Sequence, residues 1–225
     1  MVPLPPLTPR DHRPVALEAL ISAVAPPLCP ACGGPAAAGS ALCTSCRREL
    51  RWLGRAPLMH GELLVWAPLA YVGPAGALAR ALKFRGALRL AATMAAAVAA
   101  NAPPGLLKDA VLVPVPLHPV RRRRRGFNQA ERLARALASR TGLTVNDCLE
   151  RLGPRGTQVG RSRTDRKRAI EGVVRLRPRA TLPAAAVLVD DVVTTGATLE
   201  VCARALRDGG VPRVAAVAYA RTPGR

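Results

Sequence analysis

Two adjacent carboxylates and the loop that follows them are the strongest chemical signal in this sequence. In VLVDDVVTTGATLE (187–200), Asp190 and Asp191 end an aliphatic run. Residues 194–198 then lead into a sequence with helical periodicity, so exposed backbone amides and a helix N-terminus would form an anion site. Gly196 would let the backbone approach the anion closely. Carboxylates repel phosphate but accept hydrogen bonds from sugar hydroxyls, so a ribose 5-phosphate fits both parts of the segment.

Other readings of this segment account for less of it. No G-x-x-x-x-G-K-[ST] sequence occurs, which excludes a P-loop. The two aspartates are adjacent and lack the spacing that phosphoaspartate enzymes use. A polar strand end with a threonine-rich helix cap would explain either half of the segment but not both.

A second candidate site comes from four of the six cysteines. The pairs CPAC and CTSC supply Cys29, Cys32, Cys43 and Cys46. Two Cys-x-x-Cys pairs can place four thiolates around one zinc ion. Disulfides are the alternative, which a reducing cytoplasm disfavours. The sequence therefore predicts a structural zinc site, and Cys148 and Cys202 are expected in the core.

The charge of the chain favours anionic ligands. Its 225 residues include 34 Lys and Arg against 14 Asp and Glu, a net charge of +20. Such an excess attracts nucleic acid or multiply phosphorylated molecules without giving specificity. Glu18 interrupts the first apolar run, unlike a signal peptide, and the run 87–102 is too short to cross a bilayer. A cytoplasmic protein without membrane insertion is predicted.

Strands and helices alternate after a boundary near residues 54–62. The predicted strands are 63–73, 110–116, 187–191 and 213–220. The predicted helices are 77–84, 87–102, 128–140 and 198–210. This order predicts an α/β fold with a mostly parallel sheet and helices on both faces, whose ligands sit beyond the carboxyl ends of the strands. The expected domains are 1–60, with the zinc module at 29–46, and 61–225.

The motifs together resemble a known family. Residues 187–199 resemble the phosphoribosyl pyrophosphate (PRPP) motif of type I phosphoribosyltransferases. Within that superfamily the chain resembles the ComF (ComFC-like) competence family, through the cysteine-rich N-terminus, APLAYVG…ALKFRG (67–86), VPVPLHPVRRRRRGFNQA (113–130), the PRPP motif, and Gln158 with the basic run through Arg168. The resemblance implies a type I phosphoribosyltransferase-like fold with a small N-terminal four-cysteine zinc module.

The resemblance also implies roles for the matching residues. The PRPP-binding residues would be Asp190, Asp191, Val192, Val193, Thr194, Thr195, Gly196, Ala197 and Thr198, with the carboxylates on the ribose hydroxyls and the threonine loop on the 5-phosphate. A basic loop facing pyrophosphate and magnesium would include Pro116, Leu117, His118, Arg124 and Arg125. A mobile loop would contribute Gln158, Arg163, Arg166 and Arg168.

Two functions are consistent with this resemblance. The first is phosphoribosyl transfer from PRPP, with magnesium, to an acceptor that the sequence does not identify, releasing pyrophosphate. The second is a non-catalytic, single-stranded-DNA-binding accessory role in DNA uptake (natural competence) or recombination, with competence or recombination proteins as partners. Aromatic residues make up only 3% of the chain, so DNA binding would be mainly electrostatic and salt-dependent.

Overall fold

The centre of the molecule is a six-stranded, mostly parallel sheet. The computed structural model describes residues 27–37, 40–85, 88–152 and 174–223. The strands are β1 (Leu58–His60), β2 (Leu63–Trp66), β3 (Leu69–Ala70), β4 (Val111–Pro114), β7 (Ala185–Val193) and β8 (Arg213–Arg221). Their order is β1–β2–β8–β7–β4, with β3 also paired to β8. Within this sheet β1 pairs antiparallel with β2 and the other pairings are parallel, which confirms the predicted sheet type.

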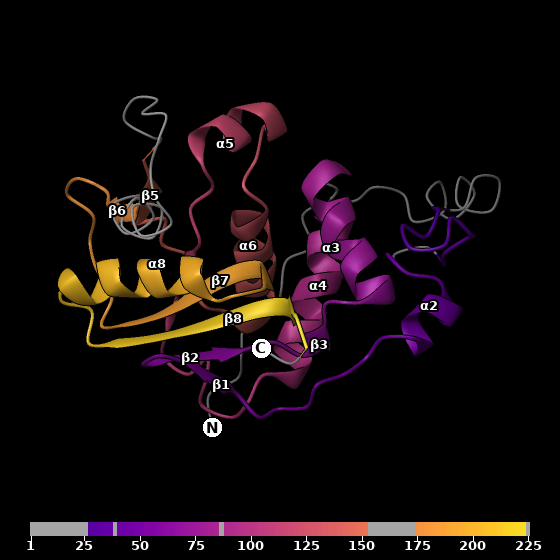
Figure 1. The fold of residues 1–225 in the computed structure, drawn as a ribbon, viewed down its shortest axis with the longest axis horizontal. Helices are drawn as coiled ribbons and strands as arrows, with labels where there is room; N and C mark the ends of the chain where they lie inside the picture. Colours follow the sequence, from indigo (N-terminus) through magenta and orange to yellow (C-terminus); the bar gives the residue numbers. More distant parts are fainter. Residues whose placement is uncertain (1–26, 38–39, 86–87, 153–173, 224–225) are drawn as a thin grey trace, which may run out of the picture.

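Helices cover both faces of the sheet, as predicted. One face carries α3 (Gly73–Arg85), α4 (Leu88–Asn101) and α6 (Gln129–Thr141), whereas α8 (Ala197–Asp208) lies along β7 and β8 on the other (Figure 1). Alternate residues of β7 serve the two faces. Val187 and Val189 pack in the core with α4 and α6, while Ala186 and Leu188 pack in the core with α8. A strand buried on both sides needs a continuous apolar sequence, which is why β7 shows no alternation.

The predicted apolar helix faces are buried. Leu133, Ala134 and Leu137 of α6 are buried, as are Leu199, Cys202, Ala203 and Leu206 of α8. Asn128 caps α6, because its side chain accepts from the amide of Ala130 at 3.1 Å. Cys148 is buried as well, so both isolated cysteines lie in the core as expected.

Two local predictions are wrong. The strand predicted at 63–73 is divided into β2 and β3, because Pro68 has no amide for a continuous ladder, and α3 already begins at Gly73. The arginine run predicted as a loop is a helix, α5 (Pro119–Arg125). Its ends explain it: His118 Nδ1 accepts from the amide of Val120 at 3.2 Å, and Gly126 closes the helix with a φ of 78°.

The remaining elements are short. A two-stranded hairpin, β5 (Leu149–Arg151) with β6 (Val174–Leu176), packs on α8, and α2 (Thr44–Arg48) belongs to the cysteine module. Backbone hydrogen bonds join the segment that follows this module to β3 and the residue before it. The amide of Leu53 donates to the carbonyl of Pro68, and the amide of Ala70 donates to the carbonyl of Arg51. The division of the chain at residue 60 stays a prediction. Nowhere in the described ranges is there a helix long and apolar enough to cross a membrane.

Candidate functional site

A cavity of about 270 Å³ opens at the carboxyl ends of β4 and β7. The site residues predicted from the sequence that line it are Pro116, Leu117, Arg125, Asp190, Asp191, Val192, Thr194 and Thr198. Residues without a predicted role also line it, namely Tyr71, Lys83, Val115, Gln129 and Arg151, together with Arg121 of the basic run 121–125 that was expected to face phosphates in part. The fold therefore places one wall from the loop after β4 opposite another from the loop after β7, as expected for a parallel sheet.

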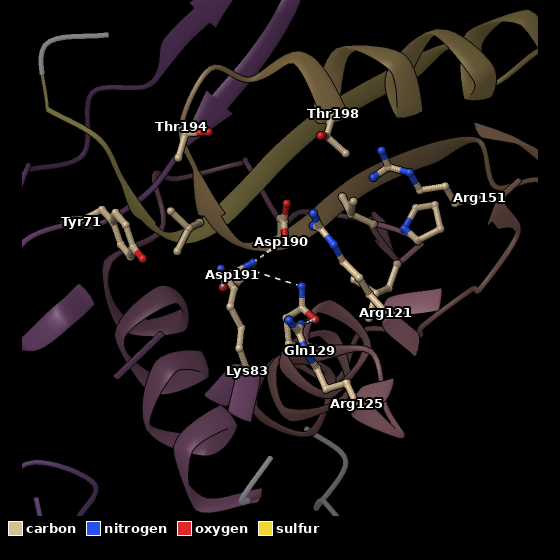
Figure 2. A pocket seen from close by; sticks show the side chains of 14 residues that line it. Tyr71, Lys83, Arg121, Arg125, Gln129, Arg151, Asp190, Asp191, Thr194 and Thr198 are labelled. Atoms are coloured by element: carbon tan, nitrogen blue, oxygen red, sulfur yellow. Dashed lines mark hydrogen bonds and ion pairs between the residues drawn. The ribbon is translucent and has the colours of Figure 1, made fainter. Parts of the chain in front are cut away.

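Asp191 is the most enclosed acidic group of this cavity. It is only 2% exposed, and Lys83 Nζ from α3 lies 2.8 Å from its Oδ2. Gln129, the first residue of α6, points its amide at Asp191 Oδ1 over 3.4 Å and accepts from Arg125 through its own carbonyl oxygen (Figure 2). A buried carboxylate requires such partners, so this network fixes the orientation of Asp191.

Asp190 is more accessible and lies on the cavity wall. Its Oδ1 accepts a hydrogen bond of 2.8 Å from the amide of Asp191. Burial, followed by the negative charge of Asp191, raises the pKa of Asp190 well above its usual value, and Lys83 offsets part of this effect. The two carboxylates therefore differ: Lys83 neutralises Asp191, while the ionised form of Asp190 is disfavoured without a ligand.

The predicted anion loop connects β7 to the N-terminus of α8. Thr194 and Thr198 lie on the opposite side of the cavity from Lys83 and Gln129 (Figure 2). Gly196 precedes α8 with a φ of 73°, so the loop turns sharply into the helix N-terminus. The predicted loop and the end of β7 line a hollow of about 40 Å³ together with Asp190 and Leu199, through Val192, Val193, Thr194, Thr195, Gly196, Ala197 and Thr198.

His60 of β1 explains why this turn contains glycine. A Cβ at position 196 would lie 2.6 Å from His60 Nδ1, closer than any ordinary contact. Glycine at this position therefore leaves room for His60 and also allows the positive φ of the turn.

The segment after β4 forms the basic side of the site. Pro116 and Leu117 line the cavity, whereas His118 is occupied as the cap of α5. Burial, then the charges of Arg151, Arg121 and Arg123, lower the pKa of His118, which favours the neutral ring that can accept the capping hydrogen bond.

The predicted Arg124 and Arg125 occupy different positions on α5. Arg124 lines a neighbouring hollow with Lys83 and Phe84, while Arg121 and Arg125 border both that hollow and the main cavity. Burial lowers the pKa of Arg125, and the nearby Asp191 acts in the opposite direction. The basic helix therefore presents Arg121 and Arg125 to the main cavity and Arg124 to the hollow beside it.

Sequence reasoning missed several lining residues. Lys83 and Gln129 fall inside the family-like segments 67–86 and 113–130, but no role was predicted for them. One signal was available, since Lys83 is one of three lysines among 34 basic residues. The predicted mobile-loop residues Gln158, Arg163, Arg166 and Arg168 lie outside the described residues.

The four cysteines of the N-terminal module come together. Their sulfur atoms all lie within 4.8 Å of one another, and Cys32 Sγ lies 3.6 Å from Cys43 Sγ. A tetrahedral site with Zn–S bonds of about 2.3 Å has S···S edges of about 3.8 Å, so the set fits zinc. The thiols are free, which disagrees with the disulfide alternative.

Backbone geometry around the first knuckle supports metal binding. The amide of Cys29 donates to Gly34, and the amide of Gly33 donates to Cys29, both at 2.8 Å. Burial alone would raise the pKa of the Cys29 thiol, but hydrogen bonds from the backbone of Cys43, Cys32 and Ala31 lower it to about 6. The pKa of the Cys46 thiol is raised, first by burial and then by the neighbouring thiols, so Cys29 is the cysteine that this geometry prepares for binding. A thiolate is the form that binds zinc.

Comparison with known proteins decides the family. The chain is 33% identical over 204 residues to the DNA utilization protein YhgH of Salmonella typhimurium, a match that covers 87% of this chain and 84% of that protein. It is 35% identical over 113 residues to Competence protein F of Haemophilus influenzae, covering 49% of each chain. The chain belongs to the ComF family. The family resemblance predicted from the sequence is thereby confirmed.

A second comparison concerns the N-terminal module of this ComF-family chain. Residues 20–58 match the family described as "Double zinc ribbon domain". That segment contains four of the six cysteines. Together with the sulfur geometry, the match identifies the site of Cys29, Cys32, Cys43 and Cys46 as that of a zinc ribbon.

Proposed function

We propose that the cavity binds PRPP with magnesium and that the protein transfers the phosphoribosyl group to an acceptor, releasing pyrophosphate. The observation that supports this most directly is that the cavity has a carboxylate side, formed by Asp190 and Asp191, directly next to a hydroxyl side, formed by Thr194 and Thr198. A ligand with sugar hydroxyls at one end and a phosphate at the other satisfies both sides. A phosphate alone would satisfy only the threonine side.

Each part of the ligand has a matching group. The carboxylate of Asp190, exposed to the cavity, accepts hydrogen bonds from the ribose hydroxyls, while Asp191 is held behind it by Lys83. The backbone amides and hydroxyls of 194–198 bind the 5-phosphate at the start of α8. Val192 and Val193 contribute only the backbone that carries the chain from the carboxylates to this loop.

The leaving pyrophosphate faces the basic side of the site. Pro116 and Leu117 form that wall, and Arg121 and Arg125 point toward the cavity from α5. As the bond between C1 and the pyrophosphate oxygen breaks, the electron pair leaves with pyrophosphate, and these cations stabilise the charge that develops. The carboxylate of Asp190 offers oxygen ligands of the kind that magnesium prefers, and a magnesium ion held there with PRPP would neutralise part of the same charge.

A calorimetric titration tests the binding site. PRPP with magnesium is titrated into the wild type and into the Asp190→Asn/Asp191→Asn variant, and we expect the variant to lose affinity by roughly a hundredfold. Asp208→Asn is the matched control, since Asp208 is exposed at the far end of α8. Equal affinity in wild type and the double variant contradicts the site. Thermal unfolding of each variant shows whether it is folded.

Transfer is tested separately from binding. Pyrophosphate release is measured with PRPP and a panel of nucleobases, nucleosides and amines as acceptors. Release that depends on an acceptor and disappears in the double variant supports catalysis. Binding without release for every acceptor supports a site that binds PRPP and transfers nothing.

Single-stranded DNA binding is a second candidate function, favoured by the basic helix α5 and the net charge of +20. The relatives named for competence and for DNA utilization support a role in DNA uptake. Our proposal extends this role to recombination and places it in the cytoplasm, with competence or recombination proteins as partners. Anisotropy of a labelled oligonucleotide should show affinity that falls steeply with salt. Affinity unchanged by moderate salt contradicts this electrostatic interaction, and DNA binding that persists in the double aspartate variant separates it from the PRPP site.

A further inference from the structure

We propose that Arg151 binds the phosphate monoester of the ligand at the N-terminus of α8, together with Thr198. This inference rests on the proposed function and names a residue outside the PRPP motif. Arg151 ends β5 and lines the cavity, where its guanidinium group points toward the side that carries Thr198 (Figure 2). The two residues come from different elements, so the fold alone brings them to the same end of the site.

The backbone of Arg151 is fixed relative to α8. Arg151 pairs with Val174 in the hairpin of β5 and β6, and β6 packs on α8. Leu149 and Val174 are buried in the same core as Leu206 of α8. The hairpin therefore holds Arg151 at a constant position with respect to the helix whose N-terminus faces the cavity.

The guanidinium group of Arg151 has unused donor capacity. Its Nε is buried without a hydrogen-bond acceptor. The neighbouring arginines of the hairpin differ, since Arg175 pairs with Glu150 at 2.7 Å and Arg177 with Asp147 at 2.9 Å. None of the ion pairs between described residues includes Arg151. A buried charged donor without an acceptor is unfavourable, and an anion bound by the rest of the guanidinium group lowers this cost because it balances the charge.

Phosphate is the anion that fits these donors. A guanidinium group presents a planar set of N–H donors that matches two oxygens of a phosphate. The hydroxyl of Thr198 and the amides at the start of α8 supply further donors from the other side. The leaving pyrophosphate has its own cations on α5, Arg121 and Arg125, so we assign Arg151 to the 5-phosphate.

The experiment compares two partial ligands. Ribose 5-phosphate and inorganic pyrophosphate are titrated separately into the wild type, Arg151→Met and Arg151→Lys. The matched control is Arg175→Met, on the same hairpin but exposed and paired with Glu150. We expect Arg151→Met to weaken ribose 5-phosphate binding by roughly ten- to a hundredfold, with pyrophosphate affinity within about twofold of the wild type. Arg151→Lys should recover part of the loss, because it keeps the charge but not the planar set of donors.

The pH dependence of binding adds a readout that a structural role would not change. A phosphate monoester loses its second proton with a pKa of about 6, so wild-type affinity for ribose 5-phosphate should rise through that pH. In Arg151→Met the rise should be smaller, because the cation that favours the dianion is gone.

The possible outcomes separate this inference from the proposed function. Loss specific to ribose 5-phosphate supports the assignment. If the wild type binds PRPP and Arg151→Met behaves like Arg175→Met, or loses mainly pyrophosphate, the assignment of Arg151 is wrong while the PRPP site stands. If the wild type binds neither PRPP nor its parts, the proposed function is wrong and the assignment with it.

Discussion

Lys83 Nζ lies 2.8 Å from Asp191 Oδ2, and this ion pair joins α3 to the carboxyl end of β7. Asp191 is almost fully enclosed, whereas a quarter of the Lys83 side chain is exposed. The pair therefore links a buried carboxylate to a lysine that solvent can reach. A ligand that brings its own negative charge meets a carboxylate whose charge is already balanced, which lowers the repulsion between Asp191 and a phosphorylated sugar.

Removal of the lysine should leave Asp191 enclosed without its cation. We expect Lys83→Met to lower the free energy of unfolding by about 1–3 kcal/mol. Urea unfolding measures this, with the exposed Lys108→Met as control. Adding Asp191→Asn to Lys83→Met should restore part of the stability, because the amide needs no counter-charge. An additive double variant would mean that the two side chains do not interact.

The raised pKa of Asp190 predicts how stability depends on pH. The folded protein keeps a proton on Asp190 at pH values where the unfolded chain has lost it, so its contribution to stability falls as pH rises through this window. Asp190→Asn does not titrate, so its stability relative to the wild type should increase as the pH rises above about 4, where the unfolded chain loses its proton. Urea unfolding at several pH values measures the difference, with Asp208→Asn as control. A difference that is constant with pH would show that Asp190 ionises as it does in the unfolded chain.

The close approach of His60 to Gly196 predicts that the loop between β7 and α8 tolerates no side chain at position 196. Gly196→Ala should lower stability by about 1–2 kcal/mol for the φ of 73° alone, and further for the 2.6 Å approach to the imidazole. It should also weaken PRPP binding, because the loop must shift. His60→Ala combined with Gly196→Ala should recover the part due to the clash and not the part due to the backbone. Thermal unfolding and titration of the three variants measure both parts, and full tolerance of Gly196→Ala would contradict the placement of β1 against the loop.

Zinc binding should stabilise the sheet domain as well as the cysteine module. Cys29 and Cys46 are buried in the core that also contains residues of α4 and β8, such as Met94 and Tyr219. Chelation, or Cys46→Ser, should therefore lower the temperature of unfolding of the whole chain, by several degrees for a loss of about 1–2 kcal/mol. Metal analysis should find one zinc ion per chain, absent from Cys46→Ser and retained in Cys202→Ala. Zinc retained by Cys46→Ser would rule out the four-cysteine site.

The sequence was enough to predict a candidate site where the groups that form it are close together along the chain. The segment 187–199 and the cysteine pairs each bring their groups together over a few residues, so the residue order was enough to predict that these groups lie side by side. The apolar helix faces were predictable for the same reason, because helical periodicity places Leu199, Cys202 and Leu206 on one side. The arginine run was misjudged because its helix depends on end effects at His118 and Gly126, which charge pattern alone does not reveal.

The sequence by itself determined the family, the α/β pattern, the zinc ligands and the carboxylate–threonine segment of the cavity. Only the tertiary structure decided that Lys83, Gln129 and Arg151 belong to the same site. They come from α3, α6 and β5, whose separation along the chain is bridged by the pairing of β4 with β7 and by the packing of the hairpin on α8. The physical reason is burial: Asp191 becomes a group that must be paired only after the surrounding helices have removed it from water.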